Sequence, residues 1–300
     1  MNAASPKIGL IGLGAMGSGM AQSLRRAGFD LQVFDVRPGV AQAFAAQGGQ
    51  AAESAAALAD ACDVVVSVVV NAAQTEALLF GTGGVAAAMR RGSVFVMCST
   101  VDPRVSIDFE TRLQALGLLY LDAPISGGAA KAASGQMTMM TAGTAEAYAR
   151  CGGALDAMAA KVYRLGDRAG AGSKVKVINQ LLAGVHIAAA AEAMALGLRE
   201  GVDPHALYEV ITHSAGNSWM FENRMAHVLA ADYTPLSAVD IFVKDLGLVL
   251  DMARASKFPL PLSSTAHQMF MQASTAGHAT EDDSAVIKIF PGITLPQKKS

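Results

Sequence analysis

The feature that most constrains the fold is a glycine pattern between a short apolar strand and a helix. Residues 7–13 are β-rich and run directly into Gly12-Leu13-Gly14-Ala15-Met16-Gly17, after which a helical window extends to Arg26. The first glycine allows a tight turn, the second a close approach of the backbone to a ligand, and the third close packing of helix on strand. The free N–H groups at such a helix start attract an anion. In this context the pattern predicts a dinucleotide site built from Gly12, Gly14, Ala15, Met16 and Gly17.

A carboxylate stands where such a site needs one. Asp35 ends the next apolar run, 23 positions after Gly12 (35 minus 12). There it can accept hydrogen bonds from the ribose hydroxyls of NAD, whereas it would repel a 2′-phosphate. Arg37, two residues further on, could tolerate that phosphate. We therefore predict NAD as the preferred cofactor, without excluding NADP.

The first half of the chain alternates β-rich runs with alanine-rich helical stretches, which is typical of βαβ units. The valine run over residues 64–70 lacks the polar alternation of a half-solvated strand, so the sheet is expected to be mostly parallel and covered on both faces. This predicts a doubly wound Rossmann domain. The expected strands span residues 7–13, 31–35, 63–69, 93–98, 118–122, 137–142 and 162–165.

After Gly166 the pattern is helical only. A long window over residues 173–199 ends before Gly201, a plausible C-cap, and shorter windows separated by Gly, Pro, Asn or Ser follow it. The sequence thus predicts an NAD-binding Rossmann domain over residues 1–168, joined by a long interdomain helix to an all-α C-terminal domain within residues 169–300. The shorter helices are expected over residues 204–213, 219–231, 238–256 and 261–276.

Composition excludes several classes of protein. With 52% hydrophobic and 16% charged residues, the 300-residue chain is too apolar to be disordered and long enough for two cores. Lys plus Arg number 23 against 25 Asp plus Glu, a net charge of −2 without a long basic run, so nucleic acid is not an expected partner. The apolar stretch over residues 177–198 is interrupted by Asn179, Gln180, His186 and Glu192, which favours a buried helix over a membrane span.

The cysteines and histidines point to a reduced, metal-free protein. Cys62, Cys98 and Cys151 form no CxxC pair, and their odd number suits a reducing compartment. The apolar run near the N-terminus is too short for a secretory signal, so a cytoplasmic location is expected. No histidines have close metal-ligand spacing, and no bound metal is predicted.

A polar cluster follows the proposed domain boundary. Gly170-Ala171-Gly172 precedes Lys176, Asn179 and Gln180, whose offsets of three and four place them on one face of a helix. A lysine in such a site can act as an acid or base. The same spacing also fits a lysine that extends into solvent while the amides cap loops, and spacing alone leaves both interpretations open.

Two strand ends offer further ligand groups. In Asp122-Ala123-Pro124-Ile125-Ser126-Gly127-Gly128, Ser126 and the glycine amides could hold a carboxylate at the edge where open α/β sheets bind ligands. An ordinary turn of small residues has the same composition. The segment from Cys98 to Thr100 raises the same pair of interpretations.

Four segments together resemble the β-hydroxyacid dehydrogenase family, which includes 3-hydroxyisobutyrate dehydrogenase. They are GLGAMGSGMAQSL from Gly12, DAPISGG from Asp122, GAGSKVKVINQ from Gly170 and FVKDLGL from Phe242, in family order and at family spacing. The resemblance covers nearly the whole chain. It implies NAD(P)-dependent oxidation of a small hydroxy acid, a Rossmann domain, a helical C-terminal domain, and assembly into homodimers or homotetramers.

The resemblance also assigns roles to residues. It makes Lys176 the catalytic acid and base, and it places Ser126, Gly127 and Gly128 beside the substrate carboxylate. Asn179 and Gln180 occupy the positions of paired substrate-binding asparagines, from which Gln180 departs by one methylene. It implies that Thr100 and Lys244 contact NAD, and that Val69 and Val70 replace a Leu-Pro pair beside the cofactor.

Further segments are similar to the subgroup that oxidises the 2-hydroxyl of L-threonate to 2-oxo-tetronate: NQLLAGVHIAAAAEAMALG, SAGNSWMFENRM, SAVDIFVKDLGL and EDDSAVIKIF. A pocket for that substrate must hydrogen-bond the distal hydroxyls, and Asn217, Ser218 and Asn223 are candidates. Two alternatives remain open: a 3-hydroxyisobutyrate dehydrogenase or tartronate semialdehyde reductase acting on a 3-hydroxyl, and a non-catalytic NAD-sensing module.

Overall fold

The computed structural model describes residues 5–298, and these form two compact units that divide between Lys176 and Val177. The sequence predicts a boundary ahead of the long helix, at residues 168 and 169. In the structure the division lies inside that helix, α9 (Ala171–Arg199).

The N-terminal unit is built on a nine-stranded sheet in the order β3-β2-β1-β4-β5-β6-β8-β7, with β9 paired to β8. The strands from β3 to β6 are all parallel, while β8 runs antiparallel to both β6 and β7. The strands are β1 (Ile8–Ile11), β2 (Leu31–Phe34), β3 (Gln50–Ala51), β4 (Val64–Ser67), β5 (Val94–Met97), β6 (Leu119–Asp122), β7 (Ile125–Ser126), β8 (Met137–Gly143) and β9 (Ala159–Arg164).

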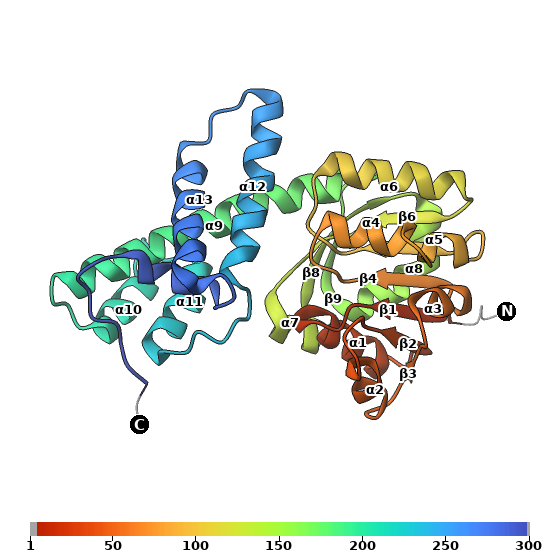
Figure 1. Cartoon of the computed structure of the whole chain (residues 1–300), viewed down its shortest axis with the longest axis horizontal. Helices are drawn as coiled ribbons and strands as arrows, with labels where there is room; N and C mark the ends of the chain where they lie inside the picture. Colours follow the sequence, from red (N-terminus) through yellow and green to blue (C-terminus); the bar gives the residue numbers. More distant parts are fainter. Residues whose placement is uncertain (1–4, 299–300) are drawn as a thin grey trace. The chain divides into compact units, whose positions relative to one another are not determined.

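Helices cover both faces of this sheet (Figure 1). Side chains alternate along a strand, so Val64 and Val66 join one core cluster with α1 and α8, while Val65 joins another with α3 and α6. This two-sided burial explains the unbroken valine run and confirms the predicted doubly wound fold. The helices are α1 (Ala15–Arg26), α2 (Val40–Ala45), α3 (Ala55–Ala61), α4 (Ala72–Phe80), α5 (Val85–Ala88), α6 (Pro103–Ala115), α7 (Gly128–Ser134) and α8 (Ala145–Met158).

The C-terminal unit is helical, as predicted. After α9 the chain forms α10 (Pro204–Thr212), α11 (Trp219–Ala230), α12 (Val239–Ser256) and α13 (Pro261–Ala273), then a π-helical turn (Ser274–His278) and a 3-10 helix (Asp283–Ile289). Asp203 and Ser218 cap α10 and α11 by accepting backbone N–H bonds. Gly201, just after α9, has a φ of +76°, which suits its predicted role as a C-cap.

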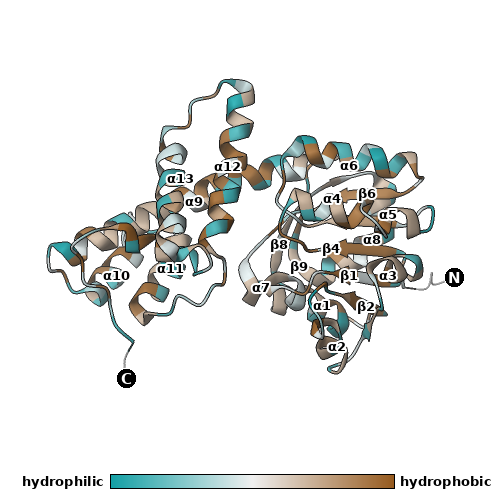
Figure 2. Ribbon diagram, in the orientation of Figure 1, coloured by the Kyte–Doolittle hydropathy of each residue, from teal (hydrophilic) through white to brown (hydrophobic). Residues whose placement is uncertain are grey.

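The core of this unit packs around one side of α9. Ile187, Ala191 and Met194 are buried with Phe242 and Phe270, whose rings stack at a centroid distance of 5.2 Å. Figure 2 colours much of α9 as hydrophobic. By length and composition α9 would suffice to cross a bilayer, but half of its most apolar window is buried inside the protein, as in a core helix.

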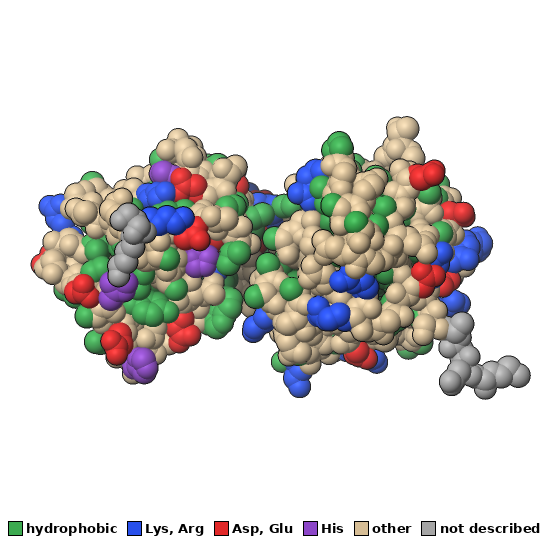
Figure 3. Space-filling model, turned by 90° about the horizontal axis from the view of Figure 1, so that it is seen from below, with side chains coloured by type: hydrophobic (Ala, Val, Ile, Leu, Met, Phe, Trp, Pro, Cys, Tyr) green, Lys and Arg blue, Asp and Glu red, His purple; other side chains and the backbone are tan. Residues whose placement is uncertain are grey.

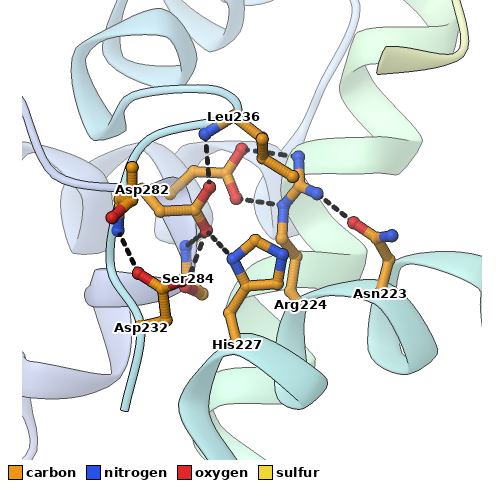
Figure 4. A network of polar contacts seen from close by, with 9 residues as sticks. Asn223, Arg224, His227, Asp232, Leu236, Asp282 and Ser284 are labelled. Atoms are coloured by element: carbon orange, nitrogen blue, oxygen red, sulfur yellow. Dashed lines mark hydrogen bonds and ion pairs between the residues drawn. The ribbon is translucent and has the colours of Figure 1, made fainter. Parts of the chain in front are cut away.

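A buried polar network ties the 3-10 helix to α11 (Figure 4). Arg224 of α11 makes an ion pair with Asp283, and both side chains are buried. The Asp282 carboxylate accepts hydrogen bonds from the Leu236 N–H and from the N–H and hydroxyl of Ser284. The two aspartates therefore lie inside the unit.

Most of the charged side chains lie at the surface. On the face drawn in Figure 3, basic and acidic side chains are interspersed over both units, with hydrophobic side chains between them. This distribution matches the near-zero net charge of the sequence.

Candidate active site

Gly12, Gly14 and Gly17 of the fingerprint are each glycine for a different physical reason. Gly12 has a φ of +97°, and a Cβ there would lie 2.6 Å from the Val68 carbonyl oxygen. A Cβ on Gly17 would lie 1.8 Å from the Gly12 carbonyl oxygen, because α1 and β1 pack that closely. A Cβ on Gly14, in contrast, would meet no heavy atom within 4 Å. Two glycines are therefore needed by the fold, and the third leaves space open at the helix start.

The start of α1 suits an anion. Within residues 5–298, no side chain caps it and no acidic residue stands in its first turn, which contains Ala15 and Met16. These features, with the open space at Gly14, fit the pyrophosphate of a dinucleotide.

Asp35 lies beside this helix start. Its carboxylate accepts a hydrogen bond from the Leu13 N–H at 2.7 Å and forms an ion pair with Arg37 at 2.9 Å. The hydrogen bond from the Arg37 side chain is the main cause that lowers the pKa of Asp35 to about 2. The carboxylate is therefore ionised at neutral pH, in the form that accepts hydrogen bonds from ribose hydroxyls.

The neighbouring strand ends bring further predicted residues to the same edge. The Val68 carbonyl oxygen lies against Gly12, and Val69 and Val70 follow it at the end of β4. The Ser99 hydroxyl donates to the Val69 carbonyl at 2.8 Å, which joins this loop to the one after β5 that holds Thr100. Val69, Val70 and Thr100 therefore lie with the fingerprint at the carboxyl edge of the sheet, where open α/β sheets bind ligands.

The segment around Ser126 forms a strand and a helix start. Ser126 ends β7, where it pairs with Thr138 of β8. Gly127 and Gly128 follow at φ values of +137° and +76°, which a residue with a side chain rarely adopts. These torsions explain why both positions are glycine.

Lys176 is positioned by a network that the sequence did not reveal. Buried Asp122, the last residue of β6, accepts hydrogen bonds from the N–H groups of Gly170 and Ser173, each at 2.9 Å, and from the Ser173 hydroxyl at 2.6 Å. A Cβ on Gly172 would lie 2.3 Å from the Met140 carbonyl oxygen. The start of α9 is thus held against the ends of β6 and β8, one turn before Lys176.

Burial distinguishes Lys176 from its neighbour. Lys176 retains only 7% of its surface, whereas Lys174 in the same turn is exposed. The side chain therefore does not extend into solvent, which was the alternative interpretation of the spacing. Burial also raises the pKa of Asp122, against the opposing hydrogen bonds from Ser173 and Gly170.

A second polar chain lies in the C-terminal unit. The Asn179 side-chain amide donates to the Gln180 oxygen at 3.1 Å, and the Gln180 amide donates to Asp245 at 2.6 Å. The other oxygen of Asp245 accepts from Lys244. The structure therefore joins Asn179, Gln180 and Lys244 through buried Asp245. Sequence reasoning missed this residue, although a carboxylate in the apolar FVKDLGL segment was a signal.

The residues proposed for distal hydroxyls have partners within the unit. Ser218 accepts from the Phe221 N–H at 3.0 Å as the cap of α11. Asn217 donates to the Thr212 carbonyl at 3.0 Å and also to Glu222. Asn223 accepts from Arg224 at the edge of the network in Figure 4. All three side chains therefore stabilise α11 and the loop that leads into it.

The three cysteines are free and buried. Within residues 5–298, no cluster of three or more His, Cys, Asp or Glu side chains is arranged to hold a metal ion.

Comparison with known proteins identifies the family. The model for the NAD binding domain of 6-phosphogluconate dehydrogenase matches residues 7–166. The model described as NAD-binding of NADP-dependent 3-hydroxyisobutyrate dehydrogenase matches residues 170–290. The chain belongs to the 3-hydroxyisobutyrate dehydrogenase-like family. It is a hydroxyacid dehydrogenase that uses a nicotinamide cofactor and a small substrate, which confirms the family resemblance.

Similar members of this family match over almost the whole chain. An L-threonate dehydrogenase of Cupriavidus necator is 69% identical, covering 98% of this chain and 99% of the relative. One of Escherichia coli K12 is 52% identical, covering 98% and 97%. The crystal structure of a 3-hydroxyisobutyrate dehydrogenase from Salmonella typhimurium, 55% identical, superposes with a TM-score of 0.91, covering 95% and 99%.

Proposed function

We propose that this dehydrogenase oxidises the 2-hydroxyl of L-threonate to 2-oxo-tetronate with NAD, and that Lys176 is its general acid and base. The observation that carries the proposal is the buried lysine one turn after a helix start that Asp122 and Gly172 hold in place. The choice of substrate is supported by the relatives named L-threonate dehydrogenase, which are 51–69% identical over nearly the full chain.

In the proposed reaction the Lys176 amine takes the proton of the substrate hydroxyl. A bound nicotinamide cofactor would supply the hydride acceptor for the same carbon. Ser126, Gly127 and Gly128 hold the carboxylate, and Asn179 and Gln180 orient the substrate hydroxyls. The rigid helix start lowers the entropy cost of bringing the amine to the reacting oxygen.

We propose NAD as the preferred cofactor because Asp35 is ionised and already satisfied by Arg37 and Leu13. A 2′-phosphate would need Arg37 to leave Asp35 and would face the remaining negative charge. In the Asp35→Ser variant, kcat/KM with NADP should therefore rise relative to that with NAD, because Arg37 is released. An unchanged ratio of the two values would contradict the assignment of Asp35.

The cellular setting is proposed from the family resemblance. The protein would act in the cytoplasm as a homodimer or homotetramer on a small hydroxy acid, with neither nucleic acid nor a membrane as partner. Sedimentation velocity of the purified protein measures the assembly directly.

The decisive experiment compares Lys176→Ala with Lys174→Ala, a control in the same turn of α9. Lys176→Ala should retain NAD binding by calorimetry and lose at least about 10³-fold in turnover, within the range for general acid–base groups. Lys174→Ala should be close to wild type because that side chain is exposed. Near-normal turnover of Lys176→Ala would refute the proposed role.

A substrate panel tests the rest of the proposal. NADH formation should be fastest with L-threonate among both threonates, both erythronates, 3-hydroxyisobutyrate and glycerate. No carbon dioxide should be released, because a 2-oxo acid lacks the β-keto arrangement that decarboxylates readily. Preference for 3-hydroxyisobutyrate would instead support the second candidate, which the name of the Salmonella structure favours.

A further inference from the structure

Helix α6 carries a carboxylate on its buried side. At the helical spacing of three and four, the side that faces the core includes Ser106, Phe109, Glu110 and Leu113. Glu110 is only 2% exposed, whereas Asp108, two residues before it, lies at the surface. A carboxylate is costly to bury unless it accepts hydrogen bonds. Glu110 therefore needs a hydrogen-bond donor at this position.

The donor belongs to the chain that leads into α9. Residues 165–170 connect β9 to α9, and the Ala169 N–H in this connecting segment donates to the Glu110 carboxylate at 3.1 Å. The next residue also packs on α6, because a Cβ on Gly170 would lie 2.9 Å from the Ile107 side chain. Helix α6 therefore contacts the connecting segment at Ile107 and Glu110, which stand one helical turn apart.

Asp122 supports the same region from β6, but at one point. The N–H groups of Gly170 and Ser173 both donate to its Oδ2 atom, and the Ser173 hydroxyl donates to Oδ1. Bonds that converge on one carboxylate fix the position of the helix start more strongly than its direction. Glu110 accepts from the residue before Gly170 and comes from a different element, so it restrains that direction.

A buried hydrogen bond holds the two supporting elements together. Helix α6 lies against β6 (Figure 1), and the hydroxyls of Ser106 and Tyr120 are 2.9 Å apart between them. Ser106 stands one turn before Glu110 in α6. Tyr120 precedes Asp122 by two residues, so both project from the same face of the strand. The spacing between the Glu110 and Asp122 carboxylates is therefore set by a bond between the elements that carry them.

We propose that Glu110 is a positioning residue for the Lys176 amine. It fixes the direction in which α9 leaves the connecting segment, and Lys176 lies on that helix three residues after Ser173. A displacement of about 1 Å at a catalytic group can cost about 10²-fold in rate. All of these residues belong to the N-terminal unit. The inference deepens the proposed function and rests on Lys176 as the general acid and base.

Two substitutions of Glu110 separate its role as an acceptor from its packing. Glu110→Met keeps a long, helix-favouring side chain that suits a buried position, but it removes the acceptor of the Ala169 N–H. Glu110→Gln retains an oxygen acceptor. Glu110→Met should lower kcat about 10- to 100-fold without changing the Kd for NAD, and Glu110→Gln should restore most of that kcat. The control Asp108→Ala removes an exposed ion pair of α6 and should keep the wild-type kcat.

A second contact of α6 is tested without opening the core. Ile107 is 41% exposed, so Ile107→Ala should fold normally while it removes the apolar contact with Gly170. It should also lower kcat, by a smaller factor than Glu110→Met, and should leave the Kd for NAD unchanged. All assays are run below the Tm of every variant.

A double-mutant cycle distinguishes positioning from a general effect on the fold. In the Lys176→Ala background, Glu110→Met should not lower the residual turnover further, because no amine remains to be positioned. A general effect would lower the residual turnover by the same factor as it lowers wild-type turnover.

The proposal is overturned by a wild-type kcat in Glu110→Met or Ile107→Ala, by a Glu110→Gln variant as slow as Glu110→Met, or by equal losses in the two backgrounds. Its failure is separable from failure of the proposed function. A Lys176→Ala variant that retains turnover refutes the role of Lys176 and this inference with it. Loss of turnover in Lys176→Ala beside a normal Glu110→Met refutes only the role of Glu110.

Discussion

Replacing Gly14 by Ala separates the folding role of the glycine fingerprint from its binding role. Gly14 has a φ of −68° and ψ of −168°, a conformation that alanine adopts without strain. Its Cβ would meet no atom of the protein within 4 Å. The new methyl group would instead occupy the space through which the backbone approaches the pyrophosphate.

The expected magnitudes follow from this geometry. Alanine is a poorer N-cap than glycine, which destabilises the folded protein slightly. Alanine also restricts the unfolded chain, which stabilises the folded protein by about 0.4–1 kcal/mol, so the two effects on stability nearly cancel. Displacing the anion from one charged hydrogen bond costs about 1.5–3 kcal/mol. The Kd for NAD should therefore rise about 10- to 150-fold, while Tm should change by less than about 2 °C.

The assay is NAD titration by calorimetry combined with thermal unfolding, on Gly14→Ala and two companions. Gly17→Ala should lose about 3 kcal/mol or more of stability, because its methyl would lie 1.8 Å from the Gly12 oxygen. Gly152→Ala, in an open position of α8, should retain the Kd for NAD and should not lower Tm, because alanine is favoured over glycine inside a helix. A Gly14→Ala variant as unstable as Gly17→Ala, or one that binds NAD normally, would refute the reasoning.

Three further predictions concern the positioning networks. Gly172→Ala should lower kcat by about 10²-fold with little change in the Kd for NAD, because its methyl would clash with the Met140 carbonyl and shift the start of α9; normal kcat would contradict this. Asp122 binds its proton more tightly when folded, so urea unfolding should show wild type gaining stability over Asp122→Asn as pH falls from 7 toward 4; a constant difference would exclude this linkage. Asp245→Leu removes the acceptor of both Gln180 and Lys244 and should lower kcat/KM about 10- to 100-fold. The control Asp251→Leu, which removes an exposed ion pair with Arg254, should keep the wild-type kcat/KM.

The parts of the fold that could be predicted are those with local periodicity. The valine run of β4 and the apolar spacing of α12 leave clear patterns, and both elements appear where expected. The strands β3 and β7 have only two residues each, which is too short for any period to be detected. The antiparallel direction of β8 was also missed, because it depends on which neighbours the strand pairs with.

The site divides in the same way. The glycine fingerprint and Asp35 are recognisable because their chemistry requires fixed spacing within one βαβ unit. Asp122 and Asp245 are not, because their roles depend on donors 48 to 65 positions away in the chain. A buried carboxylate in the sequence indicates that partners must exist, but it does not identify them.

The position of Lys176 in α9 has a consequence for how the site is held. Its helix start is held by Asp122 of the N-terminal unit, whereas Gln180 is held by Asp245 of the C-terminal unit. Because both side chains stand on one continuous helix, the spacing between the amine and the amide is set by backbone hydrogen bonds and not by the packing of either unit. A helix breaker between Lys176 and Gln180 should therefore abolish turnover without abolishing NAD binding. Ile178→Pro, unlike Ile178→Ala, should abolish turnover while the N-terminal unit still binds NAD, and retention of turnover would show that the continuity of α9 is dispensable.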